Sequence, residues 1–169
     1  MARAILLIGP VGSGKTTTLH ELEAILAARG EPHAILDLDW LAWAAPAPVT
    51  GLTAHDLLIR NLADVWRNFQ AAGIRRIALA RALHDDGEVQ AVRAALSGCE
   101  TLVVDLVGDV ALLRERVQRR DAGVELAEHL AMLDAYERGE RYLLADAVVE
   151  IDDRTPVQVA RDVLAVAGW

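Results

Sequence analysis

The chain has 169 residues, of which 53% are hydrophobic, and a formal net charge of −8 at pH 7. This length and hydrophobic content suit a single folded domain over residues 1–169 and exclude a chain that is disordered throughout. Acidic residues outnumber basic ones by 25 to 17, which argues against a general nucleic-acid-binding role, because phosphate neutralisation needs a basic surface. Cys99 is the single cysteine, so the sequence offers neither an internal disulfide nor a cysteine metal cluster.

The apolar segments of the sequence are short. None approaches the roughly 20 residues that a membrane-spanning helix needs, so we expect no membrane partner and a cytoplasmic location. The apolar run Ile5–Ile8 leads straight into a glycine-rich loop, which differs from the pattern of a signal peptide. The oligomeric state is left open by the sequence.

Short apolar runs alternate with longer helical patterns, which is typical of a parallel sheet covered by helices. The expected strands are Ala4–Ile8, His33–Asp39, Arg76–Leu83, Thr101–Leu106 and Ala147–Ile151. The expected helices are Lys15–Ala28, Thr53–Ala72, Glu88–Leu96, Val110–Arg120, Val124–Leu144 (interrupted near Gly139) and Val157–Ala167. The predicted fold class is therefore α/β, with helices on both faces of a parallel sheet.

The segment from Gly9 to Thr16 matches the phosphate-loop pattern G-x-x-x-x-G-K-[ST] between a predicted strand and a predicted helix. Its glycines allow backbone angles that side chains forbid and let amide groups approach phosphates, and the helix N-terminus adds to the anion site. Lys15 would neutralise the β- and γ-phosphates, and the Thr16 hydroxyl would ligate Mg²⁺. The predicted nucleotide-binding residues of this loop are Gly9, Gly12, Ser13, Gly14, Lys15, Thr16 and Thr17.

A phosphate loop alone does not name a reaction. A GTPase needs a guanine-reading N-K-x-D segment, and the sequence lacks one. The segment from Asp105 to Gly108 fits a D-x-x-G pattern, which we interpret as a strand-ending acid in a turn. These observations favour a kinase over a GTPase.

Two acids, Asp37 and Asp39, lie two residues apart at the carboxyl end of the second predicted strand. On a strand, residues at this spacing point to the same face, and ligands of open α/β sheets bind at the carboxyl edge. One acid can hold Mg²⁺ while the other accepts the proton of an attacking hydroxyl. The residues by themselves do not decide which acid has which role.

The order of a phosphate loop, a D-x-D segment and an arginine-rich helix after the fourth strand resembles the small P-loop kinases of the nucleoside monophosphate kinase fold. Within these, the chain is most similar to the adenylylsulfate kinase, gluconate kinase, shikimate kinase and chloramphenicol phosphotransferase branch. The resemblance implies a five-stranded parallel sheet in the order 2-3-1-4-5 and a short lid. It also implies that Asp39 is the base that binds the acceptor hydroxyl and that Asp37 lies on the metal side.

The predicted helix Val110–Arg120 is similar to the lid entry of these kinases. Its Arg116 and Arg120 are four residues apart and share one helix face. Such a pair can clamp a transferring phosphoryl group and stack on adenine. The alternative is a solvated face on which the arginines pair with Glu115 and Asp121.

The loop after the fifth strand is expected beside the adenine, on the same resemblance. Arg154 and Pro156 are its candidate nucleotide contacts. An equally good interpretation is an ordinary helix start, because Thr155 can cap the helix and Pro156 fits its first turn.

The acceptor is expected between the second strand and the helix Thr53–Ala72. Trp40 and Trp43 can hold an apolar or ring-bearing acceptor, or they can pack under a loop. Arg81 ends an aliphatic strand and needs an anionic partner, either a ligand or Asp39. The predicted substrate-binding residues are Asp39, Trp40, Trp43, Arg60, Asn61 and Arg81, with Asp56 and His84 as further lining candidates.

The sequence does not identify the acceptor. Leu38 replaces the glycine of the D-G-D signature of adenylylsulfate kinases, and the short arginine motifs of shikimate binding are not evident. The leading hypothesis is an ATP-dependent kinase that phosphorylates a hydroxyl of a small molecule. Its catalytic residues would be Lys15, Asp39, Arg116 and Arg120, with Thr16 and Asp37 on Mg²⁺.

Two alternatives stay open at this point. The first is a nucleotide-binding regulatory or accessory protein that performs no phosphotransfer. The second is a polynucleotide 5′-hydroxyl kinase, against which the net charge of −8 argues.

Overall fold

The computed structural model describes residues 1–44, 50–83, 85–139 and 145–169. Its centre is a five-stranded sheet in the order β2-β3-β1-β4-β5, in which every neighbouring pair of strands is parallel. The predicted α/β class and the strand order are therefore confirmed. The strands are β1 (Ala2–Ile8), β2 (Ala34–Asp37), β3 (Arg76–Ala80), β4 (Cys99–Val107) and β5 (Ala147–Glu150).

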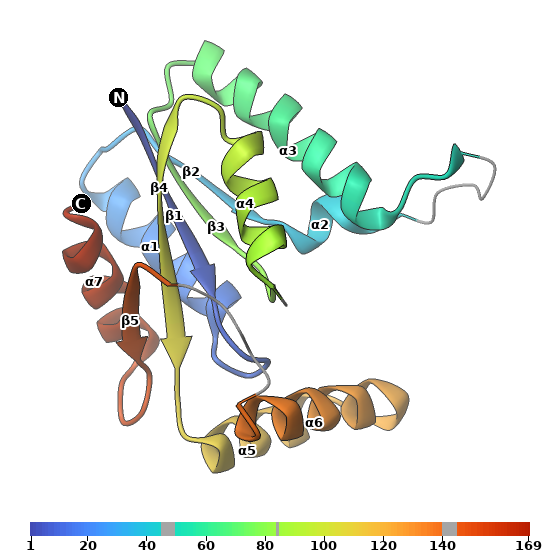
Figure 1. The fold of residues 1–169 in the computed structure, drawn as a ribbon. Helices are drawn as coiled ribbons and strands as arrows, with labels where there is room; N and C mark the ends of the chain where they lie inside the picture. The colour runs from blue at the N-terminus through green and yellow to red at the C-terminus, as the bar shows by residue number, and fades with distance from the viewer. Residues whose placement is uncertain (45–49, 84, 140–144) are drawn as a thin grey trace.

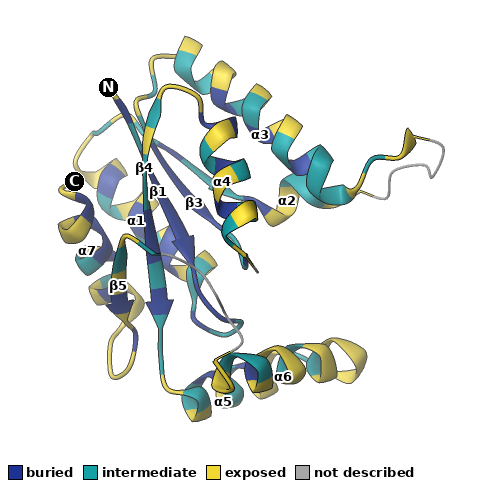
Figure 2. Ribbon diagram, viewed as in Figure 1, coloured by how far each residue is buried: buried dark blue, intermediate teal, exposed yellow. Residues whose placement is uncertain are grey.

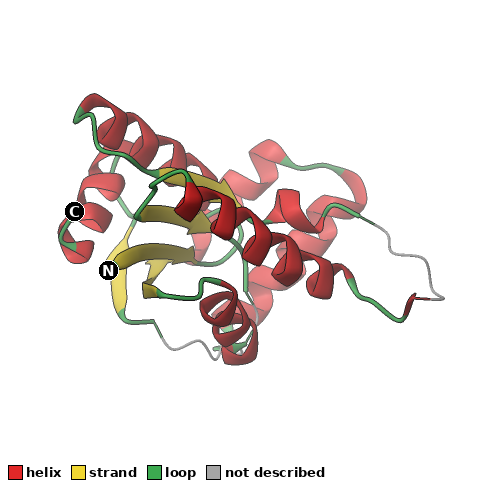
Figure 3. Ribbon diagram, turned by 90° about the horizontal axis from the view of Figure 1, so that it is seen from above, coloured by secondary structure: helices red, strands yellow, loops and turns green. Residues whose placement is uncertain are grey.

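Helices cover both faces of this sheet (Figure 1). The helices are α1 (Lys15–Ala28), α2 (Asp39–Ala42), α3 (Ala54–Ala71), α4 (Asp86–Ala95), α5 (Val110–Arg120), α6 (Gly123–Glu137) and α7 (Pro156–Ala167). The pair α1 and α7 lies on one face and the pair α3 and α4 on the other, and the view from above in Figure 3 shows the sheet between helices. The remaining pair, α5 and α6, lies beyond the carboxyl ends of the strands (Figure 1).

The central strand β1 divides the hydrophobic core into two halves. Ile5 and Leu7 pack with residues of α1 and α7, whereas Leu6 and Ile8 pack with residues of α3 and α4. All four side chains are completely buried, and Figure 2 shows the buried strand in dark blue. Because helices cover both faces, the strand is aliphatic at every position from Ala4 onward rather than alternating with polar residues.

Two helix starts follow directly from side-chain capping. Thr53 and Asp56 form a capping box at the start of α3, in which each side chain accepts the backbone N–H of the other residue. Thr155 and Gln158 form the same arrangement at α7, whose first turn holds Pro156. The expected cap-and-proline start of the last helix is thus present.

The structure corrects the predicted ends of two strands. β2 ends at Asp37 and β3 at Ala80, so Asp37 and Asp39 do not point to one face of a common strand. Leu38 is completely buried in helical backbone geometry, and Asp39 opens α2. The physical reason is that Asp37 Oδ1 accepts the backbone N–H of Asp39 across 3.1 Å, which turns the chain out of the sheet.

The interpretation of Asp105 as a strand-ending acid in a turn is also wrong. Asp105 lies within β4, where it is opposite Ile8 of β1. The strand continues for two more residues, to Val107.

Other boundaries differ by shorter stretches. The helix expected over Val124–Leu144 ends at Glu137, and Gly139 follows with a φ of +71°, an angle that favours glycine. His84 and residues 140–144 lie outside the described residues. None of the described helices has the length and apolar composition that crossing a membrane requires.

Candidate functional site

The phosphate loop joins β1 to α1 at the carboxyl edge of the sheet. Gly12 and Gly14 have φ angles of +82° and +81°, which L-residues with side chains rarely adopt. The Lys15 ammonium donates to the carbonyl oxygens of Gly9 and Pro10 across 3.0 and 2.9 Å. The lysine therefore lies over the loop, where it adds positive charge to the backbone amides at the start of α1.

A cavity of about 320 Å³ opens beside this loop. Arginines and apolar side chains line it together, a combination that suits a ligand with both charged phosphates and a flat base. The structure thus brings together phosphate-loop, α5 and post-β5 residues that the sequence analysis selected separately. The lining residues are Gly12, Ser13, Gly14, Thr17, Thr18, Arg116, Arg120, Ile151, Arg154, Pro156 and Val159.

The helix α5 packs tightly on the phosphate loop. A Cβ atom on Gly12 would lie 3.0 Å from the Leu113 carbonyl oxygen and 3.2 Å from Val117 Cγ2. Arg116 Nη1 also donates to the Gly12 carbonyl oxygen across 3.3 Å. The position of Arg116 at the cavity is therefore set by backbone contact between α5 and the loop.

Arg120 is held by a neighbouring acid. Its Nε and Nη2 donate to the two carboxylate oxygens of Asp121 across 2.6 and 3.0 Å. His129 of α6 lies 2.7 Å from Asp121 Oδ2 through its Nδ1, and the Asp121 side chain is only 3% exposed. The pKa of Asp121 is lowered to about 2, mainly because its carboxylate accepts hydrogen bonds from Arg120, and the hydrogen bond with His129 lowers it further. Asp121 therefore stays ionised and fixes Arg120.

Of the remaining charged neighbours, Glu115 pairs with Arg119, not with Arg116 or Arg120. Arg154 pairs with Asp162 of α7. The expected pairing with nearby acids is thus present for Arg119 with Glu115 and for Arg120 with Asp121. Arg120 nevertheless lines the cavity, as does Arg116.

A hydroxyl and a carboxylate meet where the phosphate loop faces β2. Thr16 Oγ1 donates to Asp37 Oδ2 across 2.8 Å. Oxygen atoms of these two kinds are the ligands that Mg²⁺ prefers, usually together with waters and phosphate oxygens. The donor set therefore fits the predicted magnesium site.

Asp39 lies in the first turn of α2, with its Oδ1 3.6 Å from Nη1 of Arg81. Its side chain keeps 71% of its surface open to water. Desolvation, with the nearby Asp37 charge in support, raises the pKa of Asp39 above 3.8 against the opposing charges of Arg81 and Lys15. Asp39 thus lies within electrostatic reach of the phosphate-loop lysine, and a raised pKa makes it a better proton acceptor.

The other predicted acceptor residues lie around α2 and α3. Trp40 and Trp43 are 68% and 79% exposed, with their rings edge to face at 5.0 Å between centroids. They do not pack under a loop among the described residues. Asn61 Nδ2 donates to the Leu41 carbonyl oxygen across 3.0 Å and so links α3 to α2. Arg60 is exposed on α3.

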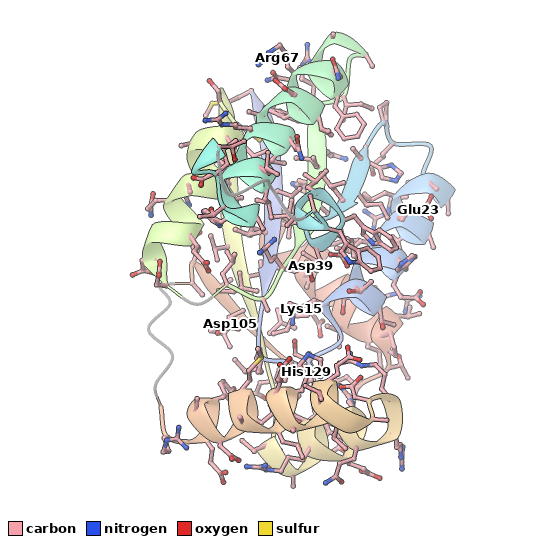
Figure 4. All side chains as sticks on the ribbon, turned by 90° about the vertical axis from the view of Figure 1, so that its right-hand side faces the viewer. Lys15, Glu23, Asp39, Arg67, Asp105 and His129 are labelled. Carbon is pink, nitrogen blue, oxygen red and sulfur yellow. The ribbon has the colours of Figure 1, made fainter. Side chains whose placement is uncertain are left out.

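Sequence reasoning missed two acids near this edge. Asp105 lies opposite Ile8, the residue that leads into the phosphate loop, and Figure 4 shows its label beside that of Lys15. The sequence signal for Asp105 is the D-x-x-G pattern from Asp105 to Gly108. The sequence indicates Asp121 as a partner of the arginines, but nothing in it places His129 against this acid.

The parallel strand order, the phosphate loop after β1 and the arginines over the adjacent cavity define a P-loop domain with the nucleoside monophosphate kinase fold of small kinases. A family model described as an AAA domain matches residues 5–138. The chain belongs to this AAA domain family. None of the curated proteins matches the chain.

Solved structures share the fold over almost the whole chain. The tunicamycin resistance protein of Deinococcus radiodurans has 17% identity and a TM-score of 0.67, covering 99% of this chain and 96% of its own. The adenylylsulfate (APS) kinase CysC of Mycobacterium tuberculosis, solved with AMPPNP and APS, has 18% identity and a TM-score of 0.63 with coverages of 99% and 98%. A gluconokinase of Sinorhizobium meliloti 1021 has 21% identity and a TM-score of 0.59 with coverages of 99% and 92%.

Proposed function

We propose that the chain transfers the γ-phosphoryl group of ATP to a hydroxyl of a small molecule. The observation that carries this proposal is the position of Asp39, a carboxylate of raised pKa beside Arg81 and within the field of Lys15. An ordered base next to a phosphate-loop lysine is what hydroxyl phosphorylation needs. The fold shared with an APS kinase and a gluconokinase supports the same class of reaction.

The donor half of the proposed site is the cavity beside the phosphate loop. The amides from Gly12 to Lys15 would bind the phosphates, with the base against Ile151 and Pro156. Lys15 would move from the carbonyl oxygens of Gly9 and Pro10 to the β- and γ-phosphates, to which its charge is better matched.

The acceptor half is at the end of β2. The acceptor hydroxyl oxygen forms a bond to the γ-phosphorus while the bond from that phosphorus to the leaving oxygen of ADP breaks. The hydroxyl proton passes to the carboxylate of Asp39. Arg116 and Arg120 would stabilise the charge that spreads over the phosphoryl oxygens.

Thr16 and Asp37 are the residues that would hold Mg²⁺ in this scheme. When bound, Mg²⁺ neutralises charge on the β- and γ-phosphate oxygens. Asp37 also keeps α2 in place through its bond to the Asp39 amide. The two acids therefore have separate tasks, although they are only two residues apart.

The test is a screen for acceptor-dependent ADP release with sugars, antibiotics, nucleosides, sulfonucleotides and a 5′-hydroxyl oligonucleotide. With an accepted substrate, Asp39→Asn should lower the rate by ~100-fold or more, the contribution of a general base, and leave ATP binding intact. Asp64→Asn is the matched control, because Asp64 is an exposed acid of α3 paired with Arg67. Full activity of Asp39→Asn would contradict the assignment of the base.

The same screen separates the two alternative functions. A nucleotide-binding regulatory protein would bind ATP without acceptor-dependent ADP release from any compound. A polynucleotide kinase would label the oligonucleotide and none of the small molecules.

A further inference from the structure

Arg81 occupies the acceptor edge of the sheet, and its position is fixed by the backbone. It directly follows β3, and its N–H donates to the Leu7 carbonyl oxygen across 3.1 Å, which extends the pairing with β1 by one residue. On the other side, the Leu38 N–H donates to the Ala80 carbonyl oxygen across 3.0 Å. Arg81 therefore emerges between the ends of β1 and β2, which carry the phosphate loop and the two acids.

The guanidinium group of Arg81 is largely buried without sufficient partners. Its side chain is 18% exposed. Nε and Nη1 are buried and have no hydrogen-bond partner among the described residues. A buried donor that has lost its water and gained no acceptor is unfavourable, and a charged one more so. This arrangement indicates that the missing hydrogen-bond acceptors of Arg81 come from a bound ligand.

Asp39 does not satisfy these donors. Its Oδ1 is 3.6 Å from Arg81 Nη1, which is too long for a hydrogen bond. Arg120 and Asp121 form a fully hydrogen-bonded ion pair for comparison. Arg120 donates two hydrogen bonds of 2.6 and 3.0 Å to a carboxylate that is 3% exposed. Arg81 and Asp39 lack such short contacts, and the Asp39 carboxylate is 71% exposed.

The two positive charges near Asp39 belong to different parts of the proposed site. The two cations that act on its carboxylate are Arg81 and Lys15. Lys15 belongs to the phosphate loop and lies over it. Arg81 lines none of the nucleotide cavity and lies beside Asp39, the proposed base for the acceptor hydroxyl.

We infer that Arg81 binds an oxyanion of the acceptor, so that the substrate is a hydroxyl compound carrying a carboxylate or a phosphate near the reactive hydroxyl. This inference rests on the proposed phosphotransfer function and names the chemical class of its acceptor. A guanidinium fork matches either oxyanion with two parallel hydrogen bonds. Nη2 would supply them together with either Nε or Nη1, because Nε and Nη1 donate on different sides of the planar group.

The first experiment measures thermal unfolding of Arg81→Met without ligands. If the guanidinium awaits a ligand, methionine removes unsatisfied buried donors and the midpoint rises, by about 2–4 °C for a chain of this size. Arg67→Met is the matched control, because Arg67 is a 72% exposed arginine of α3. A midpoint that falls for Arg81→Met and not for Arg67→Met shows a structural ion pair and overturns the inference.

The second experiment measures anion binding after Mg²⁺ and AMPPNP have filled the phosphate loop. Inorganic phosphate and malate should each raise the unfolding midpoint of the wild-type complex, relative to chloride at equal ionic strength, and should not raise that of Arg81→Met. The larger of the two responses tells whether the site prefers phosphate or carboxylate. Equal responses of wild type and Arg81→Met to both anions overturn the inference.

The third experiment compares charged and neutral acceptors in the ADP-release assay. Matched pairs such as gluconate and glucose, or glucose 6-phosphate and glucose, should differ by at least ~100-fold in kcat/KM, and Arg81→Met should remove the difference. A neutral acceptor that works equally well in wild type and Arg81→Met overturns the inference and leaves the proposed function standing. Anion binding at Arg81 with no ADP release from any acceptor contradicts the proposed function instead.

Discussion

The Thr16 hydroxyl, in the first turn of α1, donates a hydrogen bond to Asp37 Oδ2 at the end of β2 across 2.8 Å. The other oxygen of this carboxylate accepts the backbone N–H of Asp39 across 3.1 Å. One acid therefore joins the helix of the phosphate loop to the short helix that carries the candidate base.

Replacing Asp37 tests whether this acid holds Mg²⁺. Asp37→Asn keeps the size of the side chain but removes the charge that would attract Mg²⁺. The Mg²⁺ concentration for half-maximal ADP release should rise roughly tenfold, a loss of ~1.4 kcal/mol in binding, and EDTA should abolish release by both proteins. Asp64→Asn serves as the control. An unchanged Mg²⁺ requirement would place the metal on another acid, and Asp105 would be the next to test.

The pH dependence of activity should follow Asp39. The carboxyl must be ionised to take a proton, and its pKa lies above 3.8 because desolvation and Asp37 outweigh Arg81 and Lys15. The acid limb of the kcat/KM profile is therefore expected above that of an ordinary aspartate. In Arg81→Met, which loses a charge that lowers this pKa, the limb should move to still higher pH. Coincident limbs in the two profiles would show that another group controls the rate.

The same pKa has a consequence for stability. Because the folded protein holds the Asp39 proton more tightly than the unfolded chain, stability falls as the pH rises from 3.8 through the folded-state pKa. Asp39→Asn should therefore unfold at a higher temperature than wild type at pH 7, and the difference should disappear below pH 3.8. Thermal unfolding across this range is the measurement. Lower stability of the variant at pH 7 would oppose the assignment.

Asp121 should act on nucleotide binding through Arg120. In Asp121→Asn the carboxylate that receives two hydrogen bonds from Arg120 is lost, so the arginine no longer has a fixed place at the cavity. We expect affinity for a fluorescent ATP analogue to fall roughly tenfold. Arg120→Met should have a similar effect, and the double variant should lose no more than either single one, because the two residues act as a unit.

The control for this prediction lies on the same helix. Glu115→Gln removes the acid from the exposed pair of Glu115 with Arg119, and it should leave nucleotide affinity unchanged. If Glu115→Gln weakens binding as much as Asp121→Asn, a general loss of negative charge explains both.

The contact between α5 and the phosphate loop can be tested with two glycines of nearly equal backbone angle. Gly12→Ala and Gly14→Ala face the same left-handed strain, at φ angles of +82° and +81°. A Cβ on Gly12 meets backbone and side-chain atoms of α5 at 3.0 and 3.2 Å, whereas nothing lies within 4 Å of one on Gly14. Denaturant unfolding should show Gly12→Ala to be less stable than Gly14→Ala by about 1–3 kcal/mol, the cost of overpacking. Equal losses would mean that α5 is not seated on the loop in solution.

Local patterns were sufficient for most of the architecture. The aliphatic run before Gly9 and the phosphate-loop motif placed β1, the loop and α1 within two residues of their observed bounds. Capping residues such as Thr155 placed a helix start, since the hydrogen bonds of a cap are made within four residues. Patterns of a few neighbouring residues do not show where a strand ends when the side chain of its last residue bonds to a residue far away in the sequence.

The end of β2 is an example of such a strand end. Asp37 ends its strand because its Oδ1 accepts the backbone N–H of Asp39, and its Oδ2 is bonded to Thr16, 21 residues earlier. Alternation alone therefore placed Asp39 on the strand when it belongs to α2. The side chains of Arg81 and Asp39, 42 residues apart, likewise meet only because β2 and β3 are neighbours in the sheet.

The sequence by itself thus determined a parallel α/β domain with a phosphate loop, because hydrophobic periodicity and a contiguous motif are local properties of the chain. It also selected Arg116, Arg120 and Arg154, which the fold gathers at one cavity. Only the tertiary structure decided how the charges pair. Asp121 holds Arg120 with the help of His129 from another helix, whereas Arg81 is left with buried donors beside Asp39. Pairing of this kind depends on which strand and helix ends meet, and that is fixed by packing rather than by spacing along the chain.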